Sequence, residues 1–231
     1  MTDVKIVALV PTRGDRQTLL ANMHNMMSRQ TKQLYGMVVV DDTPLNPDQK
    51  DITYRYQTGL TRVFEQYPDC DVVALIEDDD WYSPQYLEKM SAAWVQAGRP
   101  HTFGQGETHY YHLGLKSMHY QKHPERSSAF TTFMSRELLK MNWPKDDYSF
   151  VDIDIWKQFP GKTICFDSPV AVGIKGYKEG AHFGGIGHND RWAGYHKGSD
   201  HNLNWLMSTI GTVDPDSFKF YKQISDRVCR G

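Results

Sequence analysis

Short apolar runs alternate with amphipathic segments through the first hundred residues. Residues 5–10, 37–40 and 72–76 are almost entirely apolar, which is typical of strands buried on both faces of a parallel sheet. Between these runs, apolar side chains recur three or four positions apart, the spacing of one helix face. These predicted helix faces comprise Leu19, Leu20, Met23, Met26 and Met27, then Tyr56, Leu60, Val63, Phe64 and Tyr67, and lastly Leu87, Met90, Trp94 and Val95. The alternation predicts an α/β fold in which a mainly parallel sheet is covered by helices on both faces.

Residues that usually begin and end helices flank these segments. Asp15 is placed to cap the first helix, and Ser83, followed by Pro84 at the first helical position, to cap a helix that closes at Gly98. The second half is less regular, and it predicts one or two strands within 101–126, strands at 131–134 and 170–174, a helix capped by Ser135, a short helix at 152–159, and amphipathic helices at 199–210 and 216–228. No Pro/Gly/Ser-rich linker or internal repeat divides the chain, so we predict a single domain over residues 1–231.

The composition is that of a globular protein with little net charge. Hydrophobic residues make up 39% and aromatic residues 13%, which excludes disordered, collagen-like and coiled-coil classes. The 26 Lys and Arg residues nearly balance the 28 Asp and Glu residues, giving a net charge of −2, so strong non-specific DNA binding is disfavoured. Cys70, Cys165 and Cys229 show no metal-site spacing and favour reduced thiols. The apolar run at 5–10 is too short for a signal-peptide core, and no stretch approaches the roughly 20 apolar residues of a membrane span, so we expect a cytoplasmic protein.

Polar residues gather where the three clearest strands end. Pro11, Thr12 and Arg13 follow the first strand, Asp41 and Asp42 the second, and the acids 77–80 the third. Ligands of open parallel sheets bind at this edge. Four consecutive carboxylates repel one another unless a cation lies among them, and Mg²⁺ or Mn²⁺ suits oxygen ligands that also face a phosphate. A solvated acidic loop is the alternative interpretation.

The order of these motifs resembles a known family. Val-x-x-Val-Pro-Thr-Arg, then Val-Val-Val-Asp-Asp, then Ala-Leu-Ile-Glu-Asp-Asp-Asp-Trp-Tyr-Ser-Pro-x-x-Leu is similar to glycosyltransferases of the GT-A fold, particularly the large family 2. The resemblance covers residues 4–95 well and 128–160 loosely. It implies an enzyme that moves a sugar from a nucleotide-diphosphate donor, most readily a UDP-sugar, to a hydroxyl acceptor with Mn²⁺ or Mg²⁺ as cofactor.

The resemblance also implies where the nucleotide would lie. Pro11, Thr12 and Arg13 would flank the base, and Asp42 would accept a hydrogen bond from a uracil-type N–H. Residues 1–98 would then form the nucleotide-sugar-binding half, 99–198 the acceptor-side half with a Gly-rich loop, and 199–231 the C-terminal helices.

The acidic run corresponds to the DxD motif of this family, which binds the ribose and the metal. Its register has two readings. Counting back from Pro84 makes Asp79 the metal ligand, whereas reading Asp78-x-Asp80 as the motif makes it Asp80. Asp79 and Asp80 are therefore both candidate metal ligands, and Asp78 would lie near the ribose.

A second acidic segment resembles the catalytic base region of inverting members of the family. Asp152 and Asp154 lie in Val151-Asp152-Ile153-Asp154, where the family commonly has Glu in place of Val151. Asp152 would deprotonate the acceptor hydroxyl as it attacks the anomeric carbon. The alternative is that Asp152 caps a short helix, and an enzyme that retains configuration needs no such base.

The Gly-rich segment 175–188 has the composition of a loop that closes over a diphosphate. Glycines allow close backbone approach, and basic side chains supply positive charge. The resemblance implies a histidine in the metal shell, His188 first and His182 second. Lys175, Lys178 and Arg191 are the candidate phosphate contacts, and His182 is also retained at the donor site.

The acceptor is left open by the sequence. Residues 101–126 hold five of the ten histidines among tyrosines and basic residues, a composition suited to stacking on a sugar or nucleic acid. A solvated strand pair with buried tyrosines explains this composition better. A glycan, a lipid-linked sugar, a protein or modified DNA could serve as acceptor. Two rival functions are a sugar nucleotidyltransferase and a catalytically silent GT-A module that binds glycan or nucleic acid.

Overall fold

The computed structural model describes residues 3–13, 16–42, 51–144, 150–176, 178–179, 182–183 and 198–228. His188 and Arg191 lie outside the described residues, as do the side chains of Lys178 and His182. The roles predicted for these four residues therefore stay predictions.

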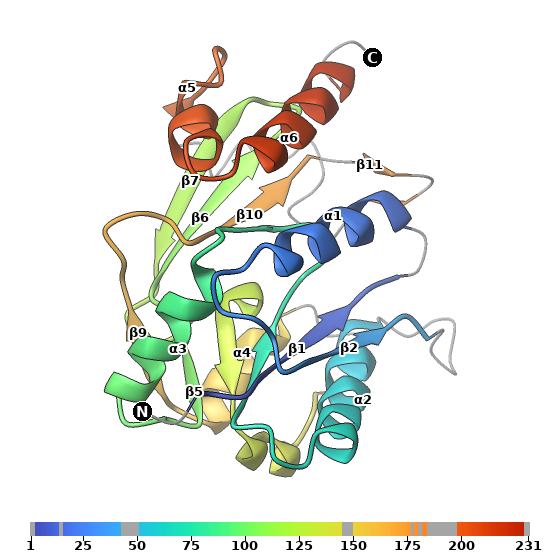
Figure 1. Ribbon diagram of the computed structural model, residues 1–231, viewed down its shortest axis with the longest axis vertical. Coiled ribbons are helices and arrows are strands. Elements are labelled where there is room, and N and C mark those ends of the chain that lie inside the picture. Colours follow the sequence, from blue (N-terminus) through green and yellow to red (C-terminus); the bar gives the residue numbers. More distant parts are fainter. Residues whose placement is uncertain are drawn as a thin grey trace.

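A six-stranded sheet forms the lower part of the molecule in Figure 1, in the order β2-β1-β3-β8-β5-β9. Its strands are β1 (Ile6–Pro11), β2 (Gly36–Val40), β3 (Val72–Leu75), β5 (Thr102–Gln105), β8 (Thr132–Met134) and β9 (Lys162–Ile164). The pairs β1–β2, β1–β3 and β5–β9 are parallel, whereas β8 runs antiparallel to both β3 and β5. The sheet is thus mainly parallel, as predicted, with one reversed strand that the sequence pattern did not indicate.

Helices cover both faces of this sheet, which confirms the predicted fold class. They are α1 (Gln17–Ser28), α2 (Asp51–Gln66), α3 (Tyr86–Gln96) and α4 (Val151–Gln158). Alternate residues of β1 enter two separate cores: Ala8 packs in the core that contains α1 and α3, and Leu9 in the core that contains α2 and α4. Burial of a leucine side chain such as that of Leu9 contributes about 1.5–3 kcal/mol.

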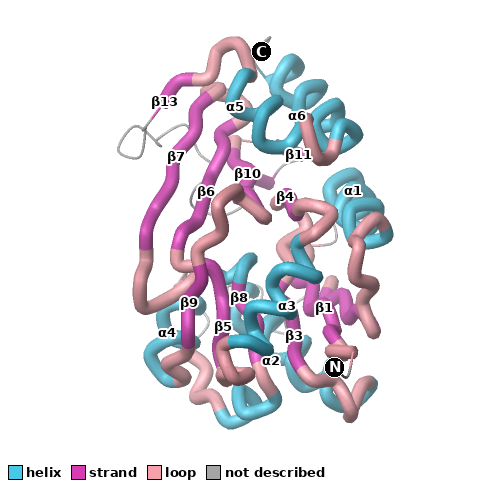
Figure 2. The backbone as a smooth tube through the Cα atoms, turned by 60° about the vertical axis from the view of Figure 1, so that its left-hand side comes forward, coloured by secondary structure: helices cyan, strands magenta, loops and turns pink. Residues whose placement is uncertain are grey.

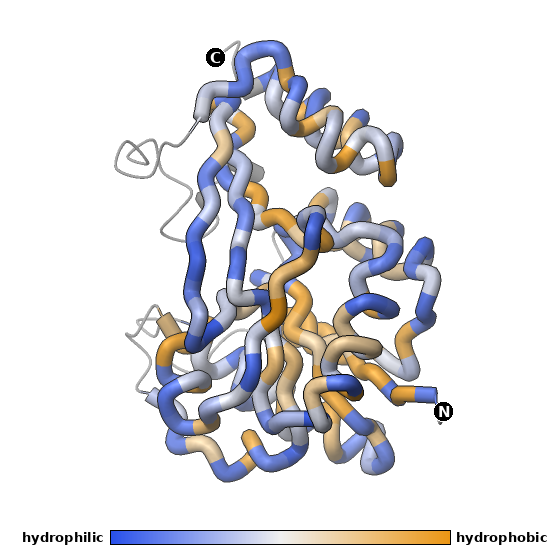
Figure 3. The backbone as a smooth tube through the Cα atoms, turned by 90° about the vertical axis from the view of Figure 1, so that its left-hand side faces the viewer, coloured by the Kyte–Doolittle hydropathy of each residue, from blue (hydrophilic) through white to orange (hydrophobic). Residues whose placement is uncertain are grey.

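A second, five-stranded sheet rises from the first toward the C-terminal helices (Figure 2). Its order is β13 (Gly198–Ser199), β7 (Ser117–Lys122), β6 (Glu107–His112), β10 (Ala171–Lys175) and β4 (Trp81–Tyr82). Only β6 and β10 pair in parallel. β1 and β3 of the first sheet are strongly apolar, whereas the β6–β7 hairpin is largely hydrophilic (Figure 3).

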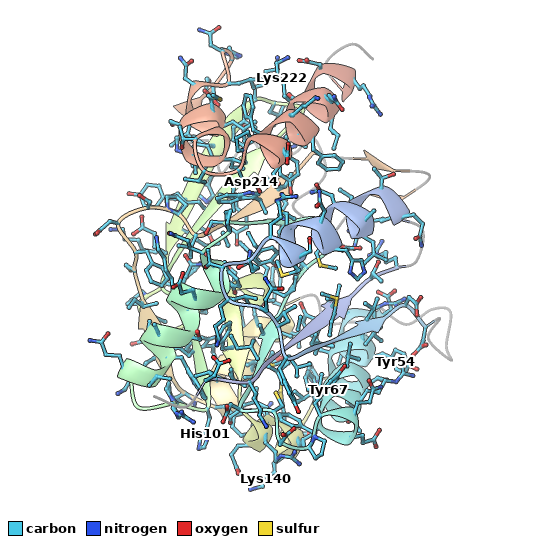
Figure 4. All side chains as sticks on the ribbon, in the orientation of Figure 1. Tyr54, Tyr67, His101, Lys140, Asp214 and Lys222 are labelled. Atoms are coloured by element: carbon cyan, nitrogen blue, oxygen red, sulfur yellow. The ribbon has the colours of Figure 1, made fainter. Side chains whose placement is uncertain are left out.

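The C-terminal helices pack above this second sheet. They are α5 (Asn204–Leu206), a π-helical turn over Met207–Gly211, and α6 (Pro215–Val228). Asp214 lies where α6 begins and faces α1 (Figure 4). Its carboxylate accepts hydrogen bonds from Trp81 Nε1 at 3.2 Å and Arg29 Nη2 at 2.9 Å, which joins the start of α6 to β4 and to the C-terminal end of α1. None of the helices in the described part of the chain combines the length and apolarity that crossing a bilayer requires.

The remaining elements are short. They comprise the 3-10 turns Ala129–Thr131 and Arg136–Lys140 and the β11 (Lys178–Glu179) and β12 (His182–Phe183) pair. Ser135 caps the second turn as predicted, because its Oγ accepts from the Glu137 N–H, but the turn is a 3-10 helix and not an α-helix.

The predicted start of α3 is wrong. The Ser83 N–H donates to the Val170 carbonyl at 2.8 Å, which extends the pairing of β4 with β10, so Ser83 does not cap the helix and α3 begins at Tyr86. The end is as predicted: Gly98 has a φ of +89°, a conformation that glycine adopts without strain.

Candidate active site

Four consecutive acids lie where the two sheets meet. Residues 77–80 follow β3 of the first sheet and lead directly into β4 of the second. The turn is fixed by the Glu77 N–H, which donates to the Tyr82 hydroxyl at 2.8 Å. The three aspartates are at most 6% exposed. The interpretation of this run as a solvated acidic loop is therefore wrong.

Three of these acids converge. Glu77, Asp79 and Asp80 each offer a carboxylate oxygen, and the three oxygens lie within 4.8 Å of one another. Carboxylate oxygens are the ligands that Mg²⁺ and Mn²⁺ prefer. This group could therefore hold a hard divalent cation, and both aspartates predicted as metal ligands belong to it.

Asp80 is the most deeply buried member of the group. Its Oδ1 accepts from the Ile174 N–H at 2.7 Å and from Lys175 Nζ at 3.3 Å. Its Oδ2 is buried and has no hydrogen-bond partner among the described residues. An orphaned buried carboxylate oxygen is costly, and a bound cation would give it a ligand bond, so the residues present fit a metal.

Asp78 and Asp79 share one cation from the chain itself. Arg16 Nη2 lies 2.7 Å from Asp78 Oδ1, and Arg16 Nη1 lies 2.9 Å from Asp79 Oδ2. Thr12, at the end of β1, donates its hydroxyl to Asp78 Oδ2 at 2.6 Å. Arg16 thus bridges Asp78 and Asp79.

Among the described residues, the cluster carries more negative than positive charge. Its four carboxylates face Arg16 and Lys175, which leaves an excess of two formal negative charges in this part of the chain. Burial, with the charge of Asp79 next, raises the pKa of Asp78 to about 7, and burial also raises the pKa of Asp80. Burial lowers the pKa of Lys175, but the charges of Asp80 and Asp79 outweigh it and raise that pKa above its usual value. One divalent cation would balance the excess.

The residues predicted to surround a nucleotide base lie at neighbouring strand ends. Pro11 and Thr12 are buried at the end of β1, and Arg13 is exposed. The Thr12 N–H donates to the Val40 carbonyl of β2 at 3.0 Å, so the two strand ends are adjacent. Asp42 forms an ion pair with Arg62 of α2 at 2.6 Å. Their roles in base binding stay predictions.

Asp152 lies in the first turn of α4 and is paired. Arg126 Nη1 lies 2.8 Å from Asp152 Oδ2. Burial raises the pKa of Asp152, and Arg126 opposes this rise. Asp154 lies in the same turn of α4, and its charge raises the pKa of Asp152 further. Phe150, and not Asp152, occupies the N-cap position of α4. The interpretation of Asp152 as the helix cap is therefore wrong, and its role as a base stays a prediction.

The partner of Asp152 is itself held by a histidine. Arg126 Nη2 lies 3.2 Å from His123 Nε2, and Gln121 Oε1 lies 2.9 Å from the same nitrogen. A guanidinium only donates and an amide oxygen only accepts, so Nε2 can hydrogen-bond to one of these two groups in a given tautomer and not to both. Burial and the Arg126 charge both lower the pKa of His123, which favours the neutral imidazole. The end of β7 therefore orients the cation that faces Asp152.

Two tyrosines contact residues of the acidic cluster, and the charge of Asp152 also acts on their hydroxyls. Tyr56 of α2 donates its hydroxyl to Glu77 Oε1 at 2.9 Å, and Lys175 Nζ lies 5.9 Å from the ring centroid of Tyr110 in β6. Burial raises the pKa of Tyr110 to about 12, and the charges of Asp80 and Asp152 contribute to the rise. Burial also raises the pKa of Tyr56, to which the charges of Glu77 and Asp152 add. Both carboxylate sites therefore act on the same region.

The Gly-rich segment begins against this region. Gly176 follows β10 with a φ of +71°, and a Cβ on it would collide with the imidazole of His112. Only glycine meets both demands. The structure thus explains the first glycine of the segment, while most of the segment lies outside the described residues.

Several contacts of the site were missed from the sequence. Glu77 belongs to the acidic run but has no place in a DxD reading, and Arg16 and Arg126 lie in loops without a motif. The available signal for Glu77 was its position directly after an apolar strand. For the two arginines no sequence signal existed, because their partners are 63 and 26 residues away.

Solved structures with the same arrangement of elements are glycosyltransferases. TarS of S. aureus, solved with UDP-GlcNAc, matches with a TM-score of 0.50 over 98% of this chain and 70% of that chain, at 11% identity. The chain has the GT-A fold. At this identity the likeness establishes the fold and no more.

Two further structures match less well. A glycosyltransferase involved in the glycosylation of the major capsid of PBCV-1 gives a TM-score of 0.43 at 12% identity, over 73% of this chain and 94% of that chain. TarS solved with UDP gives 0.47 at 14% identity, over 74% of this chain and 60% of that chain. No protein-family model and no curated protein matches the sequence.

Proposed function

We propose that this protein is a metal-dependent glycosyltransferase that moves a sugar from a nucleotide-diphosphate donor to a hydroxyl acceptor. The observation that carries the proposal is the convergence of Glu77, Asp79 and Asp80 at the edge of a GT-A sheet, around a buried oxygen without a partner. A UDP-sugar is the first donor to test, because TarS was solved with UDP-GlcNAc.

The chain's own residues divide the work between donor and acceptor. Glu77, Asp79 and Asp80 would hold Mn²⁺ or Mg²⁺, and Lys175 fixes the orientation of Asp80. When bound, this cation supplies Lewis-acid stabilisation of the negative charge that develops on the leaving diphosphate. Asp78, held by Thr12, lies beside this group for contact with the ribose.

The acceptor step would use Asp152. Its carboxylate takes the proton of the acceptor hydroxyl as the oxygen attacks the anomeric carbon, while the bond to the diphosphate breaks. Attack opposite the leaving group inverts the configuration. The raised pKa of Asp152, caused mainly by burial, makes it a stronger base than a carboxylate in water.

Titration calorimetry of UDP tests the proposal. We expect UDP to bind in the presence of Mn²⁺ and to bind much more weakly without it. Asp80→Asn should abolish the Mn²⁺-dependent part, because it removes the anionic ligand while keeping the shape. Asp71→Asn is the matched control: this acid precedes the same strand at its other end and is partly exposed. Metal-independent binding, or equal binding by both variants, would contradict the proposal.

Donor hydrolysis tests turnover without knowledge of the acceptor. Each nucleotide sugar is incubated with the protein and Mn²⁺, and release of the free nucleoside diphosphate is measured. Release from one donor that is lost in Asp152→Asn supports the assignment of the base. Release that persists at full rate in this variant would remove Asp152 from the mechanism.

A further inference from the structure

Arg16 lies between two carboxylates of the candidate site. It occupies the N-cap position of α1, and its side chain is only 11% exposed. Its guanidinium spans two carboxylates, with 2.7 Å to Asp78 and 2.9 Å to Asp79. These are the distances of charge-assisted hydrogen bonds.

Asp79 therefore has two competing uses. It belongs to the group of three carboxylates that fits a metal, and it also neutralises Arg16. A divalent cation on this group would lie next to the guanidinium, and like charges at such a distance repel strongly in a buried site. Metal binding in the absence of donor is thus opposed by Arg16.

A diphosphate would reverse this opposition. Metals of this type bridge carboxylates to phosphates, so a diphosphate on the metal would lie beside the guanidinium that contacts Asp79. Arginine matches phosphate oxygens with two parallel donors, and the N-terminal end of α1 also favours an anion. With the donor present, Arg16 has a new anionic partner and no longer needs Asp79.

The other described groups of the cluster are compatible with this exchange. Asp78 keeps the Thr12 hydroxyl at 2.6 Å if the guanidinium turns. Lys175 cannot take over the role, since its ammonium is bonded to Asp80 and it is 9% exposed. Arg16, in contrast, contacts Asp79 directly.

We propose that Arg16 couples metal binding to donor binding by exchanging its ion pair with Asp79 for one with the donor diphosphate. This inference rests on the proposed function. Because coupling between two ligands is reciprocal, the same residue weakens binding of the metal alone and strengthens binding of the metal and nucleotide together.

The test measures Mn²⁺ affinity with and without saturating UDP, by electron paramagnetic resonance of the free ion. In the wild type, UDP should tighten Mn²⁺ binding strongly. In Arg16→Gln, Mn²⁺ alone should bind about tenfold more tightly, and the enhancement by UDP should fall by about tenfold. Arg16→Lys keeps the positive charge but lacks the two parallel donors of the guanidinium, so its Mn²⁺ affinities should lie between those of the wild type and of Arg16→Gln.

Arg29→Gln is the matched control. Arg29 follows the other end of α1 and pairs with Asp214 at 2.9 Å, so its loss removes an ion pair from the same helix without touching the acidic cluster. It should leave both Mn²⁺ affinities at the wild-type values. A thermal unfolding curve for each variant establishes that it is folded.

The outcomes separate the inference from the proposed function. If the wild type binds no Mn²⁺ even with UDP, the metal-dependent function itself is wrong. If the wild type shows the enhancement and Arg16→Gln keeps it in full, Arg16 is not the coupling residue, although the function stands. Should Arg16→Gln fail to fold, an unchanged enhancement in Arg16→Lys overturns the inference equally.

Discussion

Arg126 should set the pH at which the proposed base becomes active. Its guanidinium lies 2.8 Å from Asp152 and favours the carboxylate over the acid. Burial raises the pKa of Asp152, and Arg126 opposes this rise, so Arg126→Gln should raise the pKa further. A base is lost when it is protonated, and this loss occurs as the pH falls. The acidic limb of the pH–rate profile should therefore move to higher pH in the variant.

The size of this movement follows from the geometry of the pair. Two unit charges about 4 Å apart interact by about 4 kcal/mol at an effective dielectric constant of about 20. Both side chains are partly exposed, 29% for Arg126 and 15% for Asp152, so solvent screens much of this energy. We expect a movement of about one pH unit, equivalent to about 1.4 kcal/mol, and an approximately tenfold slower reaction below the limb.

The assay is donor turnover measured from about pH 4 to 8, with the limb fitted for each variant. Arg126→Lys keeps the positive charge and should hold the limb near the wild-type position. Lys157→Gln removes a cation from the last turn of the same helix, α4, and should leave the limb unchanged. A limb that stays in place in Arg126→Gln, or that moves to lower pH, would refute the electrostatic argument.

Two further predictions concern regions outside the catalytic carboxylates. Asp214→Ala should lower the free energy of unfolding by about 2–3 kcal/mol in urea titrations, because it removes the cap of α6 and leaves buried donors unpaired. These donors are Trp81 Nε1, Arg29 Nη2 and the Ser217 N–H. A loss below about 1 kcal/mol would contradict this prediction. Burial raises the pKa of Cys70 to about 11. Iodoacetamide at pH 8 should therefore alkylate the exposed Cys165 and spare Cys70 until the protein is unfolded, which peptide mapping would detect. Equal labelling of the two cysteines in the folded protein would refute this prediction.

The elements of the first hundred residues could be predicted because each reports its own environment. A run such as 72–76 is apolar at every position, and a short run of this kind is typical of a strand buried on both faces. The second half depends on contacts between distant segments. β8 joins the first sheet antiparallel to β3, and β4 is defined by pairing with β10 about ninety residues later. Neither pairing leaves a periodic signal, so both the reversed strand and the true start of α3 at Tyr86 were missed.

The candidate site divides in the same way. The acids of the site could be found from the sequence because they directly follow strands, where the sheet exposes them to a ligand. The basic residues that pair with these acids could not be found in this way. Lys175 was expected to contact phosphate, yet it is bonded to Asp80, 95 residues away. Arg16 and Arg126 were not predicted, because folding alone brings them next to their carboxylate partners, Asp78 and Asp152.

The acidic cluster departs from what the fold alone would require. Apolar side chains at the junction of two sheets would pack without the desolvation cost of buried charges, and yet Asp80 is completely buried with one oxygen unpartnered among the described residues. Arg16 and Lys175 reduce this cost without removing it, since the described residues of the cluster keep a formal charge of −2. Sites that break local rules for stability are usually those that serve a ligand. The protein's overall charge is also −2, which is too small to suggest a local excess of negative charge. The excess arises because the acids are placed together at one strand end. A bound divalent cation is the simplest group that would neutralise this excess.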